Sequence, residues 1–158
     1  LNNEITIMRT LSHANIIKLY EVYETKSSFY MIMEVLTGGN LNDFLKKKYS
    51  FKHSEIIIII KTLLKTLQYM HSKNIMHRDI KPDNILLRKE VILEENICFA
   101  DFGLSTFTTV SEFIYHKCGT PGFVAPEILK LTKADRRKYG VSCDIFSLGV
   151  IFHILLLY

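Results

Sequence analysis

The chain is organised around one charged stretch, His77-Arg78-Asp79-Ile80-Lys81-Pro82-Asp83-Asn84. The apolar run at 56–70 before it predicts a buried helix, and residues 85–87 after it predict a short strand. A loop with this much charge between two apolar elements needs a reason to be there. Loops that carry function are commonly held on such rigid supports. The stretch is therefore the first candidate for a functional site.

Two further motifs follow the charged stretch at set distances. Asp101-Phe102-Gly103 comes directly after a predicted strand at 97–99, and Ala125-Pro126-Glu127 begins 24 residues after Asp101. Each motif alone is weak, because an Asp-Phe-Gly triplet is more often a turn at a strand end, and a lone Asp-x-Lys is commonly a surface ion pair. The order and spacing of all three together are those of the protein-kinase signature.

The composition indicates a single globular domain of 158 residues, with 48% hydrophobic and 23% charged side chains. The formal net charge of +4 is mild, and no basic stripe with interleaved aromatics is present, so we expect no nucleic-acid partner. The apolar run at 145–158 is too short for a typical spanning helix, so we expect no membrane partner. Three scattered cysteines without metal-ligand spacing favour reduced thiols and an intracellular, cytoplasmic location.

The rest of the chain predicts a mixture of helices and hairpins. Apolar periodicity favours helices, and alternating or aromatic-rich runs bounded by polar turns favour paired strands. Ser54 is the predicted N-cap of the helix that includes 56–70. The other predicted helices are 4–11, 41–48, 126–131 and 145–158, and the predicted strand pairs are 16–24 with 29–35 and 85–87 with 97–99.

With these motifs in this order, the chain resembles the eukaryotic protein kinase family over essentially all of its residues. The resemblance implies an α+β, protein-kinase-like fold that is partial. Residues 1–36 would be the C-terminal part of the small β-rich lobe with the hinge, and residues 37–158 the first half of the mainly helical large lobe, through the helix called F. The glycine-rich loop and strand lysine of the family would precede Leu1. We therefore expect these residues alone to be inactive and poorly soluble, with 145–158 exposing apolar surface.

The resemblance implies roles for the residues that perform phosphoryl transfer. Asp79 would orient the substrate hydroxyl and accept its proton, and Lys81 would stabilise the charge of the transferred group. Thr120 would hydrogen-bond to both Asp79 and Lys81. Asn84 and Asp101 would hold Mg²⁺ through oxygen atoms, the ligand type that a hard cation prefers.

The resemblance also implies an ATP site. Met33 matches the position called the gatekeeper. The backbone carbonyl of Glu34 and the backbone amide of Leu36 would bind the adenine edge, and Leu86 would pack under the ring. Glu4 matches the helix glutamate that pairs with the strand lysine.

Other residues would support the charged loop from within the core. His77 and Phe102 would belong to a stacked apolar spine, with Met8 and Leu19 above them. Asp144 would anchor the backbone of the loop from beneath.

The implied function is transfer of the ATP γ-phosphoryl group to Ser or Thr hydroxyls of protein substrates. Lys81, two residues after Asp79, and the segment 118–127 match the serine/threonine type, and 15–24 resembles the calcium/calmodulin-dependent and calcium-dependent group. One alternative is a truncated kinase-like fragment or pseudokinase that acts as a non-catalytic binding module. Another is a small-molecule kinase of similar fold.

The sequence departs from the family pattern at two places that bear on regulation and specificity. His116 stands where relatives often have a phosphorylatable Thr, so phosphorylation there is excluded, although Arg78 has the side chain to clasp such a phosphate. Asn40 replaces an acidic residue that helps relatives read a basic substrate side chain. Asp83 keeps an acid in the loop, so we expect a weakened preference for basic substrates.

Overall fold

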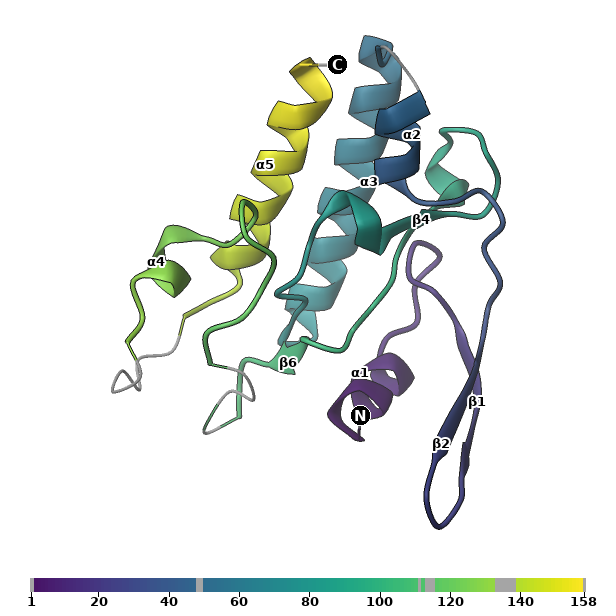
Figure 1. Ribbon diagram of the computed structural model, residues 1–158, viewed down its shortest axis with the longest axis vertical. Coiled ribbons are helices and arrows are strands. Elements are labelled where there is room, and N and C mark those ends of the chain that lie inside the picture. Colours follow the sequence, from purple (N-terminus) through teal and green to yellow (C-terminus); the bar gives the residue numbers. More distant parts are fainter. Residues whose placement is uncertain (1, 48–49, 111, 113–115, 133–138, 158) are drawn as a thin grey trace.

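The computed structural model describes residues 2–47, 50–110, 112, 116–132 and 139–157. Helices and short antiparallel strand pairs make up the described chain, which confirms the α+β class (Figure 1). In chain order the elements, with η for 3₁₀ helices, are α1 (Asn2–Thr10), β1 (Leu19–Glu24), β2 (Phe29–Met33), α2 (Leu41–Lys47), α3 (His53–Ser72), β3 (Ile75–Met76), η1 (Pro82–Asn84), β4 (Ile85–Leu87), η2 (Glu94–Asn96), β5 (Ile97–Phe99), β6 (Thr106–Phe107), α4 (Pro126–Leu129) and α5 (Ser142–Leu157).

Within the described residues the strands form three two-stranded antiparallel sheets. The predicted pairs β1–β2 and β4–β5 are confirmed, with Leu19 opposite Met33 in the first and Leu86 opposite Cys98 in the second. The third sheet, β3–β6, was not predicted. Its strands have two residues each, which is too short to show an alternating pattern.

The long helix α3 runs through the middle of the large apolar core, and α5 runs beside it (Figure 1). Its buried apolar residues recur every three or four positions, which places them on one face of the helix. These residues are Ile56, Ile59, Leu63, Leu67 and Met70. The opposite face keeps some apolar side chains exposed, as does α5, where Phe152 is 42% and Leu157 is 72% exposed.

The start of α3 corrects one expectation. The helix begins at His53 and its N-cap is Lys52, so the predicted cap at Ser54 was wrong. The backbone N–H of Lys52 donates to Oε2 of Glu55 at 2.8 Å. The carboxylate of Glu55 in the first turn thus accepts the backbone N–H of the N-cap residue, as the acidic member of a capping box does.

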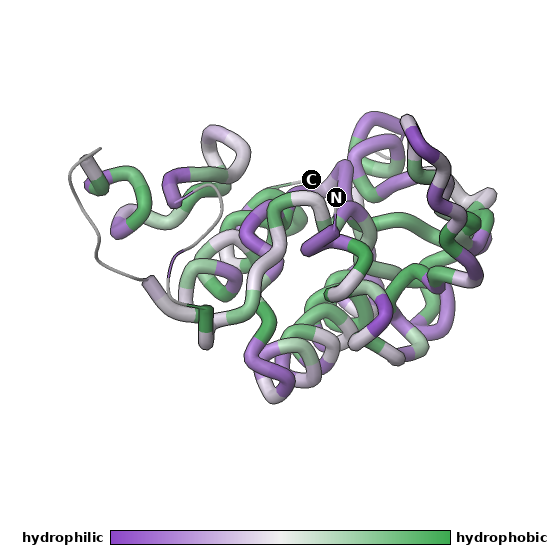
Figure 2. Tube along the Cα trace, turned by 90° about the horizontal axis from the view of Figure 1, so that it is seen from below, coloured by the Kyte–Doolittle hydropathy of each residue, from purple (hydrophilic) through white to green (hydrophobic). Residues whose placement is uncertain are grey.

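One large apolar core joins α1, α3, α5 and the strands β4 and β5. Met8 and Phe102 are buried in it, and Leu19 packs against it, so three of the four residues predicted to form the stacked apolar spine share one cluster. Ile80, the apolar member of the charged loop, is only 1% exposed. Burial of such a side chain contributes about 1.5–3 kcal/mol, which fastens the loop to the core. Figure 2 shows how hydrophobic and hydrophilic stretches alternate along the chain.

Two features of the described residues concern the cysteines and the helices. Cys98, Cys118 and Cys143 are all free. Among the described helices, none combines the length and the hydrophobicity that a bilayer-spanning helix requires.

Candidate active site

The loop 77–84 is anchored from beneath by Asp144 of α5. The fully buried carboxylate accepts the backbone N–H of His77 at 2.9 Å and that of Arg78 at 2.8 Å. The ring nitrogen Nε2 of His71 lies 2.9 Å from the same carboxylate. The predicted anchoring by Asp144 is thereby confirmed. Arg78 has a φ of 68°, a left-handed conformation that costs about 1–3 kcal/mol, and these bonds hold it in place.

His77 links the loop to the chain that follows β5. The backbone N–H of Asp79 donates to His77 Nδ1 at 3.3 Å, so the ring proton sits on Nε2, which donates to the carbonyl of Ala100 at 3.1 Å. Burial lowers the pKa of His77, which agrees with a neutral ring. Its ring centroid lies 5.1 Å from that of Phe102, so the predicted contact between these two side chains is present.

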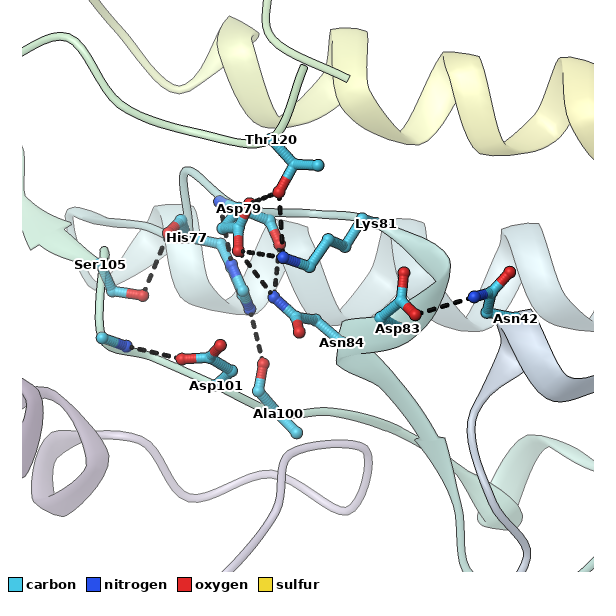
Figure 3. Close-up of polar contacts among 11 residues, drawn as sticks. Asn42, His77, Asp79, Lys81, Asp83, Asn84, Ala100, Asp101, Ser105 and Thr120 are labelled. Atoms are coloured by element: carbon cyan, nitrogen blue, oxygen red, sulfur yellow. Dashed lines mark hydrogen bonds and ion pairs between the residues drawn. The ribbon is translucent and has the colours of Figure 1, made fainter. Parts of the chain in front are cut away.

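Asp79 is the centre of a four-residue hydrogen-bond network (Figure 3). Thr120 Oγ1 donates to Asp79 Oδ1 at 2.6 Å, and Lys81 Nζ donates both to Asp79 Oδ2 and to Thr120 Oγ1 at 2.9 Å. Asn84 Nδ2 donates to the backbone carbonyl of Asp79 at 2.9 Å and to its Oδ2 at 3.0 Å. The predicted contacts of Thr120 with Asp79 and Lys81 are therefore confirmed.

The network sets the charge of the Asp79 carboxyl group. Burial by itself raises the pKa of Asp79, but hydrogen bonds from Thr120 and Lys81, together with nearby positive charge such as that of Lys81, outweigh it, so the pKa lies below its usual value. Asp79 is thus an oriented carboxylate at neutral pH. Such a group can accept a proton from a hydroxyl held within hydrogen-bond reach.

Asn84 and Asp101 are the residues that fit a divalent cation. The backbone N–H of Ala100 donates to the carbonyl of Asn84 at 3.0 Å, so Asp101 follows a residue bonded directly to Asn84. The Asn84 amide nitrogen is engaged by Asp79, and among the described residues no hydrogen bond ends on its side-chain oxygen. Asp101 is exposed and has a φ of 58°. One carboxylate and one amide oxygen suit Mg²⁺, which takes its other ligands from water and phosphate.

Helix α1 brings a second carboxylate to this region. Burial, and after it the negative charge of Asp101, raise the pKa of Glu4. The neighbouring Asn3 donates its side-chain N–H to the carbonyl of Ser105 at 2.7 Å, which ties α1 to the chain after Asp101. A cation bound nearby would offset the negative charge that Asp101 places beside Glu4.

Of the residues predicted to bind adenine, Glu34 and Leu36 lie in the segment between β2 and α2. Met33 ends β2 and is 37% exposed, while Leu36 and Leu86 are half-buried. Two backbone hydrogen bonds of 2.9 Å join residues 38–39 to Leu87, so this segment runs along β4. The structure therefore brings the segment containing Leu36 alongside the strand containing Leu86.

The two predicted substrate-binding residues have different surroundings. The exposed Asp83 accepts the side-chain N–H of Asn42 at 2.8 Å (Figure 3). Asn40 instead accepts the backbone N–H of Asp43 at 2.9 Å, which makes it the N-cap of α2. The sequence pattern did not indicate this structural contact of Asn40.

The side chain of Arg78 is engaged within the protein. Its Nε donates to the carbonyl of Leu104 at 2.7 Å, and its Nη1 donates to the hydroxyl of Tyr139 at 2.9 Å. The ring of His116 lies against Tyr139, with 6.0 Å between centroids. The guanidinium that would clasp a phosphate thus already has a hydroxyl and a carbonyl as acceptors.

Three residues near the site were missed by sequence reasoning, namely Asn42, Tyr139 and Arg88. Their partners Asp83, Arg78 and Glu34 are 41, 61 and 54 residues away along the chain. No helical or strand periodicity reaches over such separations, so no local signal was available.

Comparisons with known proteins identify the family of the chain. The family model for the protein kinase domain matches residues 1–158. The serine/threonine-protein kinase DCLK3 of Mus musculus is 43% identical over 99% of this chain and 19% of the relative, and its Homo sapiens counterpart is 41% identical over 99% and 23%. Calcium/calmodulin-dependent protein kinase type 1 of Caenorhabditis briggsae is 40% identical over 99% and 42%.

These relatives bear out the resemblance to serine/threonine kinases of the calcium/calmodulin-dependent group. The chain spans between about a fifth and a half of the length of the curated relatives described above and of a related Dictyostelium discoideum kinase. The match extends over every motif of the site, from Glu4 on α1 to Asp144 on α5. The chain therefore belongs to the protein kinase domain family.

Proposed function

We propose that the protein containing this chain is a protein serine/threonine kinase, which transfers the γ-phosphoryl group of ATP to Ser or Thr hydroxyls of protein substrates. The observation that carries the proposal is the network in which Thr120, Lys81 and Asn84 hold both carboxylate oxygens of Asp79 within 3.0 Å. Phosphoryl transfer depends mainly on positioning and on charge stabilisation, and this network supplies both.

In this mechanism Asp79 orients the acceptor hydroxyl and takes its proton. Thr120 fixes one carboxylate oxygen and Asn84 fixes the other, so the carboxylate has one orientation relative to the loop. Lys81 places its positive charge between Asp79 and Thr120, beside the position of the acceptor, where it stabilises the transferred group.

The nucleotide and the metal ion would be held by Asn84, Asp101 and the segment between β2 and α2. The side-chain oxygen of Asn84 and the carboxylate of Asp101 would bind Mg²⁺, which supplies neutralisation of the phosphate oxygens. The backbone groups of Glu34 and Leu36 would bind the adenine edge, with Met33 and Leu86 against the ring.

In this proposal the chain comprises two parts of a kinase domain. Residues 1–36 are the C-terminal part of the small lobe and the hinge. Residues 37–158 are the first half of the large lobe. The retained Asp79, Asn84 and Asp101 favour an active parent enzyme over a non-catalytic module.

An Asp79→Asn substitution in the full-length natural protein tests the proposal. Loss of the proton acceptor is expected to lower kcat for phosphorylation of a Ser/Thr peptide by about 10²–10⁴-fold, while binding of a fluorescent ATP analogue is retained. Glu90→Gln, at an exposed ion pair with Lys47, is the control and keeps wild-type kcat. Undiminished peptide phosphorylation by Asp79→Asn shows the assignment of Asp79 to be wrong. A wild-type protein that binds the analogue but phosphorylates no peptide favours the binding-module alternative.

A further inference from the structure

The side chains of Glu34 and Arg88 form a two-point ion pair. Arg88 Nε donates to Glu34 Oε1 at 2.6 Å, and Nη2 donates to Oε2 at 3.1 Å. Only 23% of the Arg88 side chain and 15% of the Glu34 side chain are exposed. Parallel bonds between a guanidinium and a carboxylate are strong and directional. This pair therefore differs from the exposed pair of Lys47 and Glu90, whose side chains are 70% and 64% exposed.

Arg88 is itself fixed by its surroundings. Its Nη1 donates to the carbonyl of Glu95 at 2.7 Å, and its backbone N–H donates to the carbonyl of Asn96 at 2.9 Å. Its own carbonyl accepts the hydroxyl of Thr37 at 3.1 Å. The β4–β5 connection thus presents the guanidinium in one orientation towards Glu34.

Glu34 belongs to the segment between β2 and α2, and this segment has little freedom to move. The backbone N–H of Glu34 donates to the carbonyl of Lys18 at 2.9 Å. A Cβ added at Gly38 would lie 2.4 Å from the carbonyl carbon of Lys89, so the chain there passes directly against the end of β4. The hydrogen bond from Arg88 lowers the pKa of Glu34, which keeps the carboxylate charged at neutral pH.

We propose that Arg88 is a positioning residue for the nucleotide. By holding the Glu34 side chain, Arg88 sets where the Glu34 carbonyl and the Leu36 amide point. This inference rests on the proposed function, in which those two backbone groups bind the adenine edge. A segment ordered before the ligand arrives binds more tightly, because less conformational freedom is lost on binding.

Substitutions at Arg88 in the full-length natural protein test this role. Arg88→Met keeps the length of the side chain and removes both bonds, and is expected to raise the Kd of a fluorescent ATP analogue and the KM for ATP by roughly 5- to 20-fold. The kcat and the KM for peptide are expected to stay within about twofold, since the hydrogen bonds of Arg88 go to Glu34, Thr37, Glu95 and Asn96 and not to the Asp79 network. Lys47→Met, at the exposed pair, is the matched control and leaves all four quantities unchanged.

Two further variants separate positioning from simple loss of stability. Arg88→Lys keeps the positive charge but loses the planar guanidinium that makes two parallel hydrogen bonds. The Kd of this variant for the ATP analogue is therefore expected to lie between those of wild type and Arg88→Met. The double change Glu34→Arg with Arg88→Glu restores part of the affinity if the pair itself is what matters.

The possible results separate the role of Arg88 from the kinase proposal. An Arg88→Met variant whose melting temperature falls while its Kd for the analogue stays at the wild-type value overturns the inference. If wild type binds the analogue but phosphorylates no peptide, the kinase proposal fails, and the comparison of Kd values still decides the role of Arg88. If wild type binds no adenine nucleotide, both proposals are wrong.

Discussion

Replacement of Asp144 is the sharpest test of how the loop 77–84 is built. The carboxylate is fully buried and serves two backbone N–H groups and the ring of His71. One of the two N–H groups belongs to Arg78, whose left-handed backbone conformation is unfavourable by itself. Asp144→Ala removes every acceptor at once and leaves buried donors without partners.

The magnitude follows from these contacts. A hydrogen bond to a charged group contributes about 1.5–3 kcal/mol, but neighbouring bonds do not add independently. We therefore expect Asp144→Ala to cost about 4–5 kcal/mol, near the upper end for a single substitution. Asp144→Asn keeps one acceptor oxygen and turns an amide N–H₂ towards the other donor, so about 2–3 kcal/mol is expected.

The assay combines global and local measurements on the full-length natural protein. At about 2–4 °C per kcal/mol for a domain of this size, Asp144→Ala lowers Tm by about 8–20 °C. Amide hydrogen exchange at His77 and Arg78 accelerates in both variants, and the graded Asn variant gives an answer even if the Ala variant does not fold. His153→Ala, at an exposed position of the same helix, is the control and stays within about 0.5 kcal/mol of wild type. An Asp144→Ala protein with wild-type Tm and exchange would refute the reasoning.

Two other predictions concern the network and the segment beside β4. Thr120→Val removes a hydrogen bond that lowers the pKa of Asp79, so the pKa of Asp79 is expected to rise. The acid limb of the kcat–pH profile then moves to higher pH, and kcat falls about 10- to 150-fold. Thr120→Ser keeps the hydroxyl and is the control, and an acid limb that does not move in Thr120→Val contradicts the prediction. Gly38→Ala places a Cβ 2.4–2.8 Å from backbone atoms of residues 87 and 89 and is expected to cost about 1–3 kcal/mol or more in urea unfolding. Gly140→Ala meets nothing within 4 Å and is its control; equal stability of the two variants contradicts the steric argument.

Much of the fold was predictable because it depends on local periodicity. The apolar residues of α3 recur at helical spacing, and strands β4 and β5 are joined by a connection with charged residues on both sides of its centre. Boundaries were less accurate. The N-cap is Lys52, a residue type outside the usual N-cap preferences, so a rule based on Ser placed the cap two residues too late. The sheet β3–β6 was missed because its pairing is set by tertiary packing.

The sequence by itself determined the family and predicted which groups react. Order and spacing of the motifs from Asp79 to Glu127 carry that information, since each motif is contiguous along the chain. Only the tertiary structure decided how these groups are held. Arg88 meets Glu34, and Tyr139 meets Arg78, across more than fifty residues of intervening chain. Such contacts arise from packing of distant elements, for which a linear sequence has no period or spacing rule.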